Sequence, residues 1–141
     1  MKAAMDSAPA FQRQPINSMS DAAREVSAVR TRLIELGFAP GAAALVATAV
    51  SELASNLVYH AGHGTLMTRT IKETHRVGFE VIAEDDGPGI SDWDQACTEG
   101  YSTAGSLGLG LAGVLRIMDE VEFDRDFSSG TRIRAVRWRS L

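Results

Sequence analysis

Residues 20–36 carry apolar side chains at helical spacing, which predicts an amphipathic helix. Spacings of three and four place these side chains on one face, as in a helix packed against a core. The apolar positions on this face are Val26, Val29, Leu33 and Leu36. Ser20 stands where an N-cap is expected, and Gly37 is the expected end of the helix.

A second helix is predicted from Pro40 to about Tyr59, because proline suits the first helical turn and Gly62 follows as a stop signal. At about 100° per residue, its apolar positions form one stripe. The stripe consists of Val46, Val50, Leu53 and Leu57. Glu52 and Asn56 fall together on a neighbouring face, so the helix is expected to present two polar side chains beside the core.

Runs rich in β-branched and aromatic residues predict one short strand and two hairpins. The hairpins turn at residues 74–76 and at the glycine-containing residues 128–130. The predicted strands cover residues 16–19, 65–73, 77–85, 121–127 and 131–138. Residues 109–120 return to helical spacing, whereas residues 91–106 show almost no apolar periodicity and are expected to form a mobile flap. This order predicts an α+β fold, with an antiparallel or mixed sheet and helices on one face.

The composition narrows the class of protein. The 141 residues are 45% hydrophobic and 23% charged, as in a single globular domain, and the formal net charge of −4 argues against a nucleic-acid partner. Cys97 is the only cysteine, which favours a reducing cytoplasm. His60 and His63 lack a third ligand at a suitable spacing and are expected to cap a helix end. Residues 1–14 are expected to be a disordered tail, neither signal peptide nor membrane anchor, before one domain over residues 15–141.

Asp85 is the first candidate for chemistry, because it ends a predicted apolar strand and precedes a Gly-Pro-Gly turn. A carboxylate beside exposed backbone can accept a hydrogen bond from an exocyclic amino group such as that of adenine. Thr131, on the strand after the Gly130 turn, can supply a hydroxyl nearby. The ordinary alternative for such a loop is stabilisation by Asx turns alone. The candidate nucleotide-binding residues in this stretch are Asp85, Gly87, Gly89 and Ile90.

A second glycine-rich stretch leads into the helix predicted at residues 109–120. Free amides and the positive end of a helix dipole attract phosphate oxygens at such a place. The candidate residues are Gly105, Ser106, Leu107, Gly108, Leu109, Gly110 and Leu111. The spacing of these glycines also fits a dinucleotide-binding fingerprint. That fingerprint requires a strand immediately before the first glycine, whereas a polar segment precedes it here. Close helix packing is a further alternative.

Glu52 and Asn56 are the remaining candidates. The amide oxygen of Asn56 can complete an octahedral Mg²⁺ whose other ligands are phosphates and waters. Glu52, one helical turn earlier, can orient or deprotonate an attacking hydroxyl. The alternative for such a pair is an ordinary solvent-exposed helix face. The functional interpretation of Glu52 and Asn56 therefore depends on their occurrence together with the two glycine-rich stretches.

Taken together, these motifs resemble those of the GHKL ATPase and kinase superfamily. Glu52 and Asn56 resemble its N box, Asp85-x-Gly87-x-Gly89 its first glycine box and residues 108–111 its second, in family order. Gly130-Thr131 is similar to the closing motif. Residues 99–103 and 108–113 most resemble the serine/threonine switch kinases of bacterial stressosomes, with anti-sigma factor kinases a little more distant.

The resemblance implies a two-layer α/β sandwich, the Bergerat fold, that binds ATP and Mg²⁺. It implies that Asp85 binds adenine, that Asn56 binds the metal and that Glu52 acts as the base. Residues 91–107 would form the ATP lid. It also implies a STAS-domain protein as phosphoacceptor and a second partner, commonly a signalling phosphatase, that the released kinase activates. The alternative within the same fold is an anti-sigma factor, a nucleotide-gated module that binds a sigma factor.

One position departs from the pattern of the superfamily. Asp86 follows the Asp of the first glycine box, where relatives often carry Asn. A second negative charge directed at phosphates would weaken nucleotide binding. We therefore predict that the Asp86 side chain points to solvent.

Overall fold

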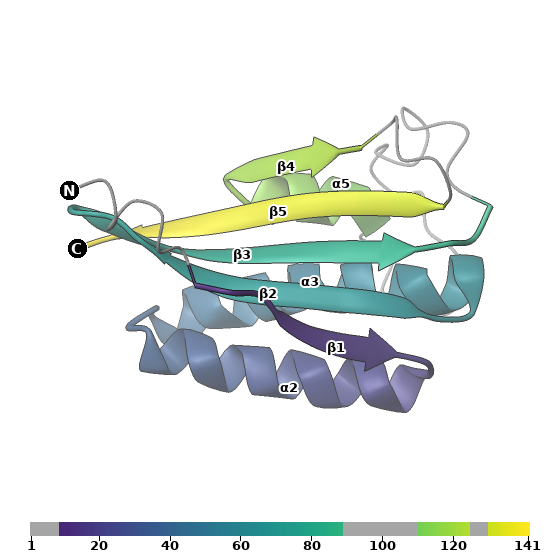
Figure 1. The fold of residues 1–141 in the computed structure, drawn as a ribbon. Helices are drawn as coiled ribbons and strands as arrows, with labels where there is room; N and C mark the ends of the chain where they lie inside the picture. The colour runs from purple at the N-terminus through teal and green to yellow at the C-terminus, as the bar shows by residue number, and fades with distance from the viewer. Residues whose placement is uncertain (1–8, 89–109, 125–129) are drawn as a thin grey trace.

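The computed structural model describes residues 9–88, 110–124 and 130–141. Within these ranges the chain forms five strands and three helices, arranged in two layers (Figure 1). The flap expected at residues 91–106 lies outside the described residues, as do Cys97 and the turn residues 128 and 129.

The strands form one antiparallel sheet in the order β1-β2-β3-β5-β4. They are β1 (Gln12–Ile16), β2 (Gly64–Lys72), β3 (Arg76–Asp85), β4 (Glu120–Phe123) and β5 (Thr131–Ser140). Both predicted hairpins are confirmed, since β2 pairs with β3 and β4 with β5. The central strand β3 pairs along its whole length with β5, so Asp85 at its end lies opposite Thr131.

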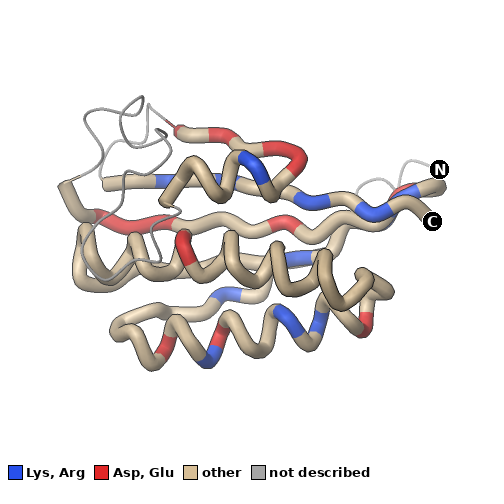
Figure 2. Tube along the Cα trace, turned by 180° about the vertical axis from the view of Figure 1, so that it is seen from behind, with Lys and Arg blue, Asp and Glu red and all other residues tan. Residues whose placement is uncertain are grey.

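The helices cover one face of this sheet. They are α2 (Met19–Glu35), α3 (Pro40–Ala61) and α5 (Gly110–Ile117), and the view from behind in Figure 2 shows them in front of the strands. Helix α3 is central, because it contacts both other helices as well as β1, β2 and β3. The predicted α+β fold with helices on one face is confirmed, and it is a two-layer sandwich.

Helix α3 is long and apolar enough, by length and composition, to cross a membrane. In this fold α2, α5 and the sheet surround it instead. Its predicted stripe is buried, with Val46, Val50, Leu53 and Leu57 at most 2% exposed. Burial in the core therefore accounts for its apolar character.

Helices α2 and α3 begin and end at residues that favour helix termini. The N-cap of α2 is Ser18 and not Ser20 as predicted; its hydroxyl accepts a hydrogen bond of 3.1 Å from the backbone amide three residues later. Gly37 follows the helix with a φ of 90°. Pro40 begins α3, and Gly62 caps it in the left-handed conformation, as predicted.

The prediction of a first strand at residues 16–19 is wrong. Strand β1 ends at Ile16, and Met19 already begins α2. Residues 12–14, expected in the disordered tail, pair with β2. Ile16 is the one buried side chain of β1, so backbone pairing at a sheet edge holds the strand, and its sequence carries no alternating apolar signal.

The third helix ends at Ile117, three residues before the end of the predicted range of residues 109–120. The Asp119 amide donates a hydrogen bond of 2.8 Å to the Val136 carbonyl, and its carboxylate accepts one of 2.7 Å from the Trp138 amide. These hydrogen bonds to β5 therefore place Asp119 beside the sheet, and the helix ends before a further turn forms.

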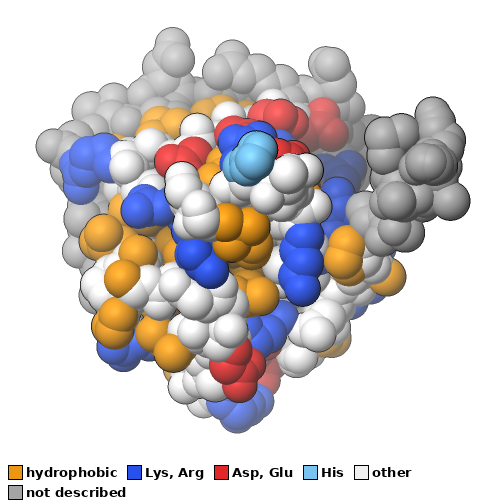
Figure 3. All heavy atoms as spheres, turned by 90° about the vertical axis from the view of Figure 1, so that its left-hand side faces the viewer, with side chains coloured by type: hydrophobic (Ala, Val, Ile, Leu, Met, Phe, Trp, Pro, Cys, Tyr) orange, Lys and Arg blue, Asp and Glu red, His pale blue; other side chains and the backbone are white. Residues whose placement is uncertain are grey.

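The end of the molecule that carries the β2–β3 turn and the C-terminus is shown in Figure 3. Lys and Arg side chains are interspersed there with separate hydrophobic side chains. Asp85 and Thr131 belong to the opposite end of the β3–β5 ladder. The candidate site is therefore built at the end of the sheet away from this surface.

Candidate functional site

Asp85 ends β3 with a side chain that is largely buried. Its residue is 9% exposed, and its Oδ1 accepts a hydrogen bond of 2.9 Å from the Gly87 amide. This is the Asx turn that the sequence allowed as the ordinary alternative. Oδ2 has no hydrogen-bond partner among the described residues, so the turn leaves one carboxylate oxygen for a ligand.

Two glycines allow close packing around Asp85. Gly130 has a φ of 89°, and a Cβ atom there would lie 1.9 Å from the carbonyl oxygen of Asp85. A Cβ atom on Gly87 would lie 2.6 Å from the Cβ of Ala61 at the end of α3. The absence of side chains therefore lets β5, the turn after β3, and α3 meet at one place.

Asn56, Asp85 and Thr131 line one small cavity. Asn56 comes from α3, Asp85 from the end of β3 and Thr131 from the start of β5. The rest of the lining consists of Leu53, Leu57, His60, Ala83 and Ile133. Apolar walls with a few converging polar groups are typical of sites for small ligands, although the space between these side chains is only about 10 Å³.

Glu52 lies deeper than Asn56 and in a different environment. It is 1% exposed, and its Oε1 accepts a hydrogen bond of 3.1 Å from the amide of Gly110, the first residue of α5. Glu52 does not line the cavity that contains Asn56. The two residues are one turn apart on α3, as predicted, but Glu52 contacts α5 while Asn56 faces the cavity.

Two members of the predicted second glycine-rich stretch begin α5. Gly110 is buried with a φ of 54°, and Leu111 is 3% exposed within the hydrophobic core. The Leu111 side chain therefore packs in the core. Seven predicted site residues lie outside the described part of the chain, namely Gly89, Ile90, Gly105, Ser106, Leu107, Gly108 and Leu109.

The cavity wall contains residues that were not predicted as site residues. Leu53 and Leu57 were expected only as part of the α3 core stripe, and His60 only as a helix-end residue. Ala83 and Ile133 stand two residues from Asp85 and Thr131 on their strands. Because side chains on a strand alternate between faces, this spacing places each on the same face as its polar neighbour. Strand alternation could therefore have identified them.

Asp86 points to solvent, as predicted. Its side chain is 72% exposed, and its Oδ1 lies 3.8 Å from Nε2 of His63. The extra negative charge at this position is therefore screened by water.

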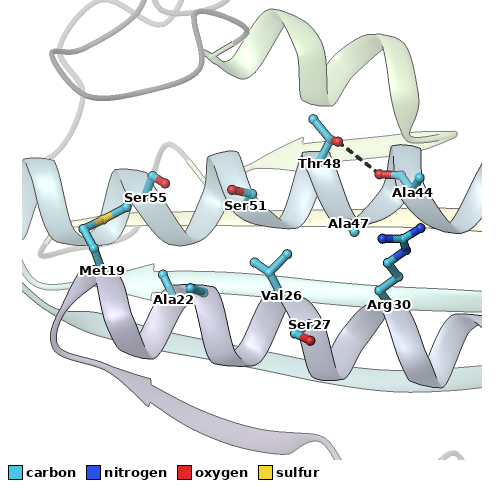
Figure 4. Close-up of a pocket in the computed structure, with 11 residues that line it drawn as sticks. Met19, Ala22, Val26, Ser27, Arg30, Ala44, Ala47, Thr48, Ser51 and Ser55 are labelled. Atoms are coloured by element: carbon cyan, nitrogen blue, oxygen red, sulfur yellow. Dashed lines mark hydrogen bonds between the residues drawn. The ribbon is translucent and has the colours of Figure 1, made fainter.

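A larger groove runs between α2 and α3 (Figure 4). Small and hydroxyl side chains dominate its lining, including Ser27, Thr48, Ser51 and Ser55. The Thr48 hydroxyl donates a hydrogen bond of 3.0 Å to the Ala44 carbonyl within its own helix. Neither Glu52 nor Asn56 contributes to this groove, so it is separate from the candidate site.

Residues 16–137 match the family model of the histidine kinase-like ATPase domain. The chain belongs to this family. The match spans β2, β3, β4, most of β5 and all three described helices, and it includes Glu52, Asn56, Asp85 and Thr131.

Two relatives of this histidine kinase-like ATPase domain carry functional names. The chain is 42% identical over 104 residues to the serine/threonine-protein kinase RsbT of Bacillus subtilis (strain 168), which covers 74% of this chain and 78% of that protein. It is 36% identical over 94 residues to the anti-sigma F factor of Clostridium novyi (strain NT), which covers 62% of this chain and 65% of that protein. The cavity lined by Asn56, Asp85 and Thr131 lies within the part of the chain that matches the histidine kinase-like ATPase domain.

Proposed function

We propose that this protein is a serine/threonine-protein kinase of a partner-switching stress-signalling module. It transfers the γ-phosphate of ATP to a serine or threonine of a STAS-domain protein. Once released, it binds and activates a downstream regulator such as a signalling phosphatase. The identity to RsbT supports the activity, and the shared cavity of Asn56, Asp85 and Thr131 is the structural observation that carries the proposal.

Asp85 is the proposed adenine-binding residue. Its Oδ1 is held by the Gly87 amide, so Oδ2 is oriented and available to accept a hydrogen bond from the adenine amino group. The Thr131 hydroxyl lies beside it, and Leu53, Leu57 and Ile133 supply apolar walls for the ring. The main chain of Gly87, Gly89 and Ile90 and of residues 105–111 completes the proposed nucleotide contacts.

Asn56 is the proposed Mg²⁺ ligand. In the described part of the chain, no three His, Cys, Asp or Glu side chains cluster into a metal cage. A single neutral oxygen beside a nucleotide cavity suits Mg²⁺, which keeps several waters and is held largely through phosphates. When bound, the ion neutralises charge on the phosphates during transfer.

Glu52 is the proposed general base. The acceptor hydroxyl oxygen attacks the γ-phosphorus, an oxygen–phosphorus bond forms, and the bond from the γ-phosphorus to the bridging oxygen breaks, so that ADP carries away the electron pair. The hydroxyl proton passes to Glu52. Oε1 of Glu52 is engaged by Gly110, and Oε2 has no hydrogen-bond partner among the described residues.

Phosphotransfer tests this proposal directly. The protein is incubated with Mg²⁺, ATP labelled at the γ-phosphate and a STAS-domain protein from the same organism, and label on the acceptor is measured. We expect labelled acceptor with the native protein and none with Glu52→Gln. Label transfer by Glu52→Gln would remove Glu52 from the mechanism, and no transfer by the native protein to any such acceptor would contradict the kinase proposal.

The similarity to an anti-sigma F factor supports a second candidate function. In that case, the nucleotide controls docking of a sigma factor. Capture of a purified sigma factor by the Glu52→Gln variant in the presence of ATP, with the same affinity as the native protein, would favour this alternative. The proposed kinase, whose downstream partner is a signalling phosphatase and not a sigma factor, predicts no stable sigma-factor complex.

A further inference from the structure

We propose that Glu52 also positions helix α5. One side chain then acts as the general base and also holds the start of the helix that is proposed to bind the phosphates. This inference rests on the proposed function, because it assigns a second role to the proposed base. It makes Glu52 a positioning residue for Gly110 and Leu111. The consequence is that nucleotide affinity depends on whether residue 52 can accept a hydrogen bond, independently of whether it can accept a proton.

The contact that carries the inference is buried and joins segments far apart in the chain. The amides of a helix's first turn have no partner within the helix. In α5 the amide of Gly110 donates to Oε1 of Glu52 at 3.1 Å, across 58 residues of sequence. Glu52 is 1% exposed, so water cannot easily replace its carboxylate as the acceptor. A carboxylate at this end also matches the positive end of the helix dipole.

The other end of α5 is held by a charge of opposite sign. Nη1 of Arg137, from β5, donates a hydrogen bond of 2.6 Å to the carbonyl of Ile117, the last residue of the helix. An anion at the start and a cation at the end both match the helix dipole. Helix α5 is therefore fixed to α3 at its start and to β5 at its end.

This arrangement links α5 to the nucleotide cavity. Asn56 lines the cavity and stands one helical turn after Glu52 on the same helix. The hydrogen bond thus sets the distance between the start of α5, where Gly110 and Leu111 are proposed to contact phosphates, and the proposed Mg²⁺ ligand. Loss of the acceptor at residue 52 leaves a buried amide unpaired and frees the start of α5 to shift.

Substitutions at residue 52 separate the two roles. Glu52→Gln keeps an acceptor oxygen at nearly the same place but removes the base, whereas Glu52→Ala removes both. Glu52→Asp keeps a carboxylate but shortens the side chain by one methylene, which withdraws the acceptor from Gly110. Ser51→Ala is the matched control, because Ser51 lies on the same helix and lines the groove between α2 and α3.

Three measurements are made on each variant of the full chain: hydrogen exchange of the Gly110 amide by NMR, Mg·ATP affinity by titration, and phosphotransfer. In Glu52→Gln and Ser51→Ala we expect exchange and ATP affinity within about twofold of the native protein. In Glu52→Ala and Glu52→Asp we expect Gly110 to exchange at least about tenfold faster and ATP to bind about tenfold more weakly. Glu52→Asp provides the comparison if Glu52→Ala does not fold.

Equal ATP affinity and equal Gly110 exchange in Glu52→Gln and Glu52→Asp would overturn the positioning role. That result would leave the base role intact if phosphotransfer is lost in Glu52→Gln. Conversely, phosphotransfer by Glu52→Gln together with weak ATP binding by Glu52→Asp would contradict the base role and support the positioning role. The two failures are therefore distinguishable.

Discussion

Asp85 and Thr131 are directly opposite each other in the β3–β5 ladder, and both line the cavity that Asn56 reaches from α3. Antiparallel register fixes this relationship, because a shift of one residue in either strand would turn the side chain on that strand to the other face of the sheet. The ladder continues in register from this pair to Arg76 and Ser140 at its far end. The central pairing of the sheet thus determines the geometry of the candidate site.

Gly130→Ala should destabilise the protein and weaken ATP binding. The φ of 89° at Gly130 is unfavourable for a side chain, and the new Cβ atom would collide with the Asp85 carbonyl at 1.9 Å. We expect a loss of at least about 2 kcal/mol in the free energy of unfolding, measured by urea denaturation. Gly41→Ala is the control, since a Cβ atom at Gly41 would meet no other atom within 4 Å, and it should be neutral or slightly stabilising. Equal effects of the two substitutions would contradict this prediction.

Glu80→Gln should cost considerably more stability than Glu122→Gln. Glu80 is 2% exposed on β3, with Oε1 2.6 Å from Nε of Arg69 and Oε2 bonded to Nε of Arg134. Removal of its charge leaves two arginines without their buried anion, which costs about 3 kcal/mol. The Glu122 side chain also contacts Arg134, at 3.2 Å, but it is 69% exposed and should contribute less than about 1 kcal/mol. Chemical denaturation of both variants gives the comparison.

Glu120 should make stability depend on pH in the acid range. The hydrogen bond from the Trp138 indole, and the nearby Arg134, hold the pKa of Glu120 below its ordinary value of 4.5. Because the folded-state pKa is lowered, the stabilisation is present above about pH 4.5 and is lost as the pH falls through the folded-state pKa. The difference in free energy of unfolding between the native protein and Glu120→Gln should therefore shrink below that pH. A difference that stays constant from neutral to acid pH would show that Glu120 is not stabilised in its charged form.

Asp86→Asn should leave ATP affinity nearly unchanged. The Asp86 side chain is 72% exposed, so its charge is screened by water. We expect a change of less than about threefold in the dissociation constant for Mg·ATP, measured by calorimetric titration. An increase in affinity of much more than tenfold would mean that Asp86 faces the phosphates.

Regular periodicity made most of the fold predictable. Helices α2 and α3 and the two hairpins bury continuous or alternating apolar positions, and such patterns are visible in the sequence. Strand β1 was misplaced because Gln12, Arg13 and Gln14 are exposed on an edge strand that backbone pairing holds. Its formation depends on β2, which is far away in the sequence.

The candidate site was predictable in its polar residues and less so in their environments. Motif spacing identified Asn56, Asp85 and Thr131, and the fold brings them to one cavity. The burial of Glu52 against Gly110 depends on how α5 packs on α3, and the position of Glu52 on α3 does not indicate it. Likewise, strand alternation marks Glu80 as an outward polar residue, and only the flanking arginines bury it.

The most direct test of the proposed site is the affinity of Asp85→Asn for Mg·ATP, measured by equilibrium titration with Asp86→Asn as the control. Asparagine retains an oxygen that can accept the hydrogen bond from Gly87, so the turn and the fold should persist, which circular dichroism can verify. The loss of a charged acceptor for the adenine amino group should weaken binding at least about tenfold, while the control binds as the native protein does. Unchanged ATP affinity in a correctly folded Asp85→Asn would contradict the proposal that this cavity holds the nucleotide.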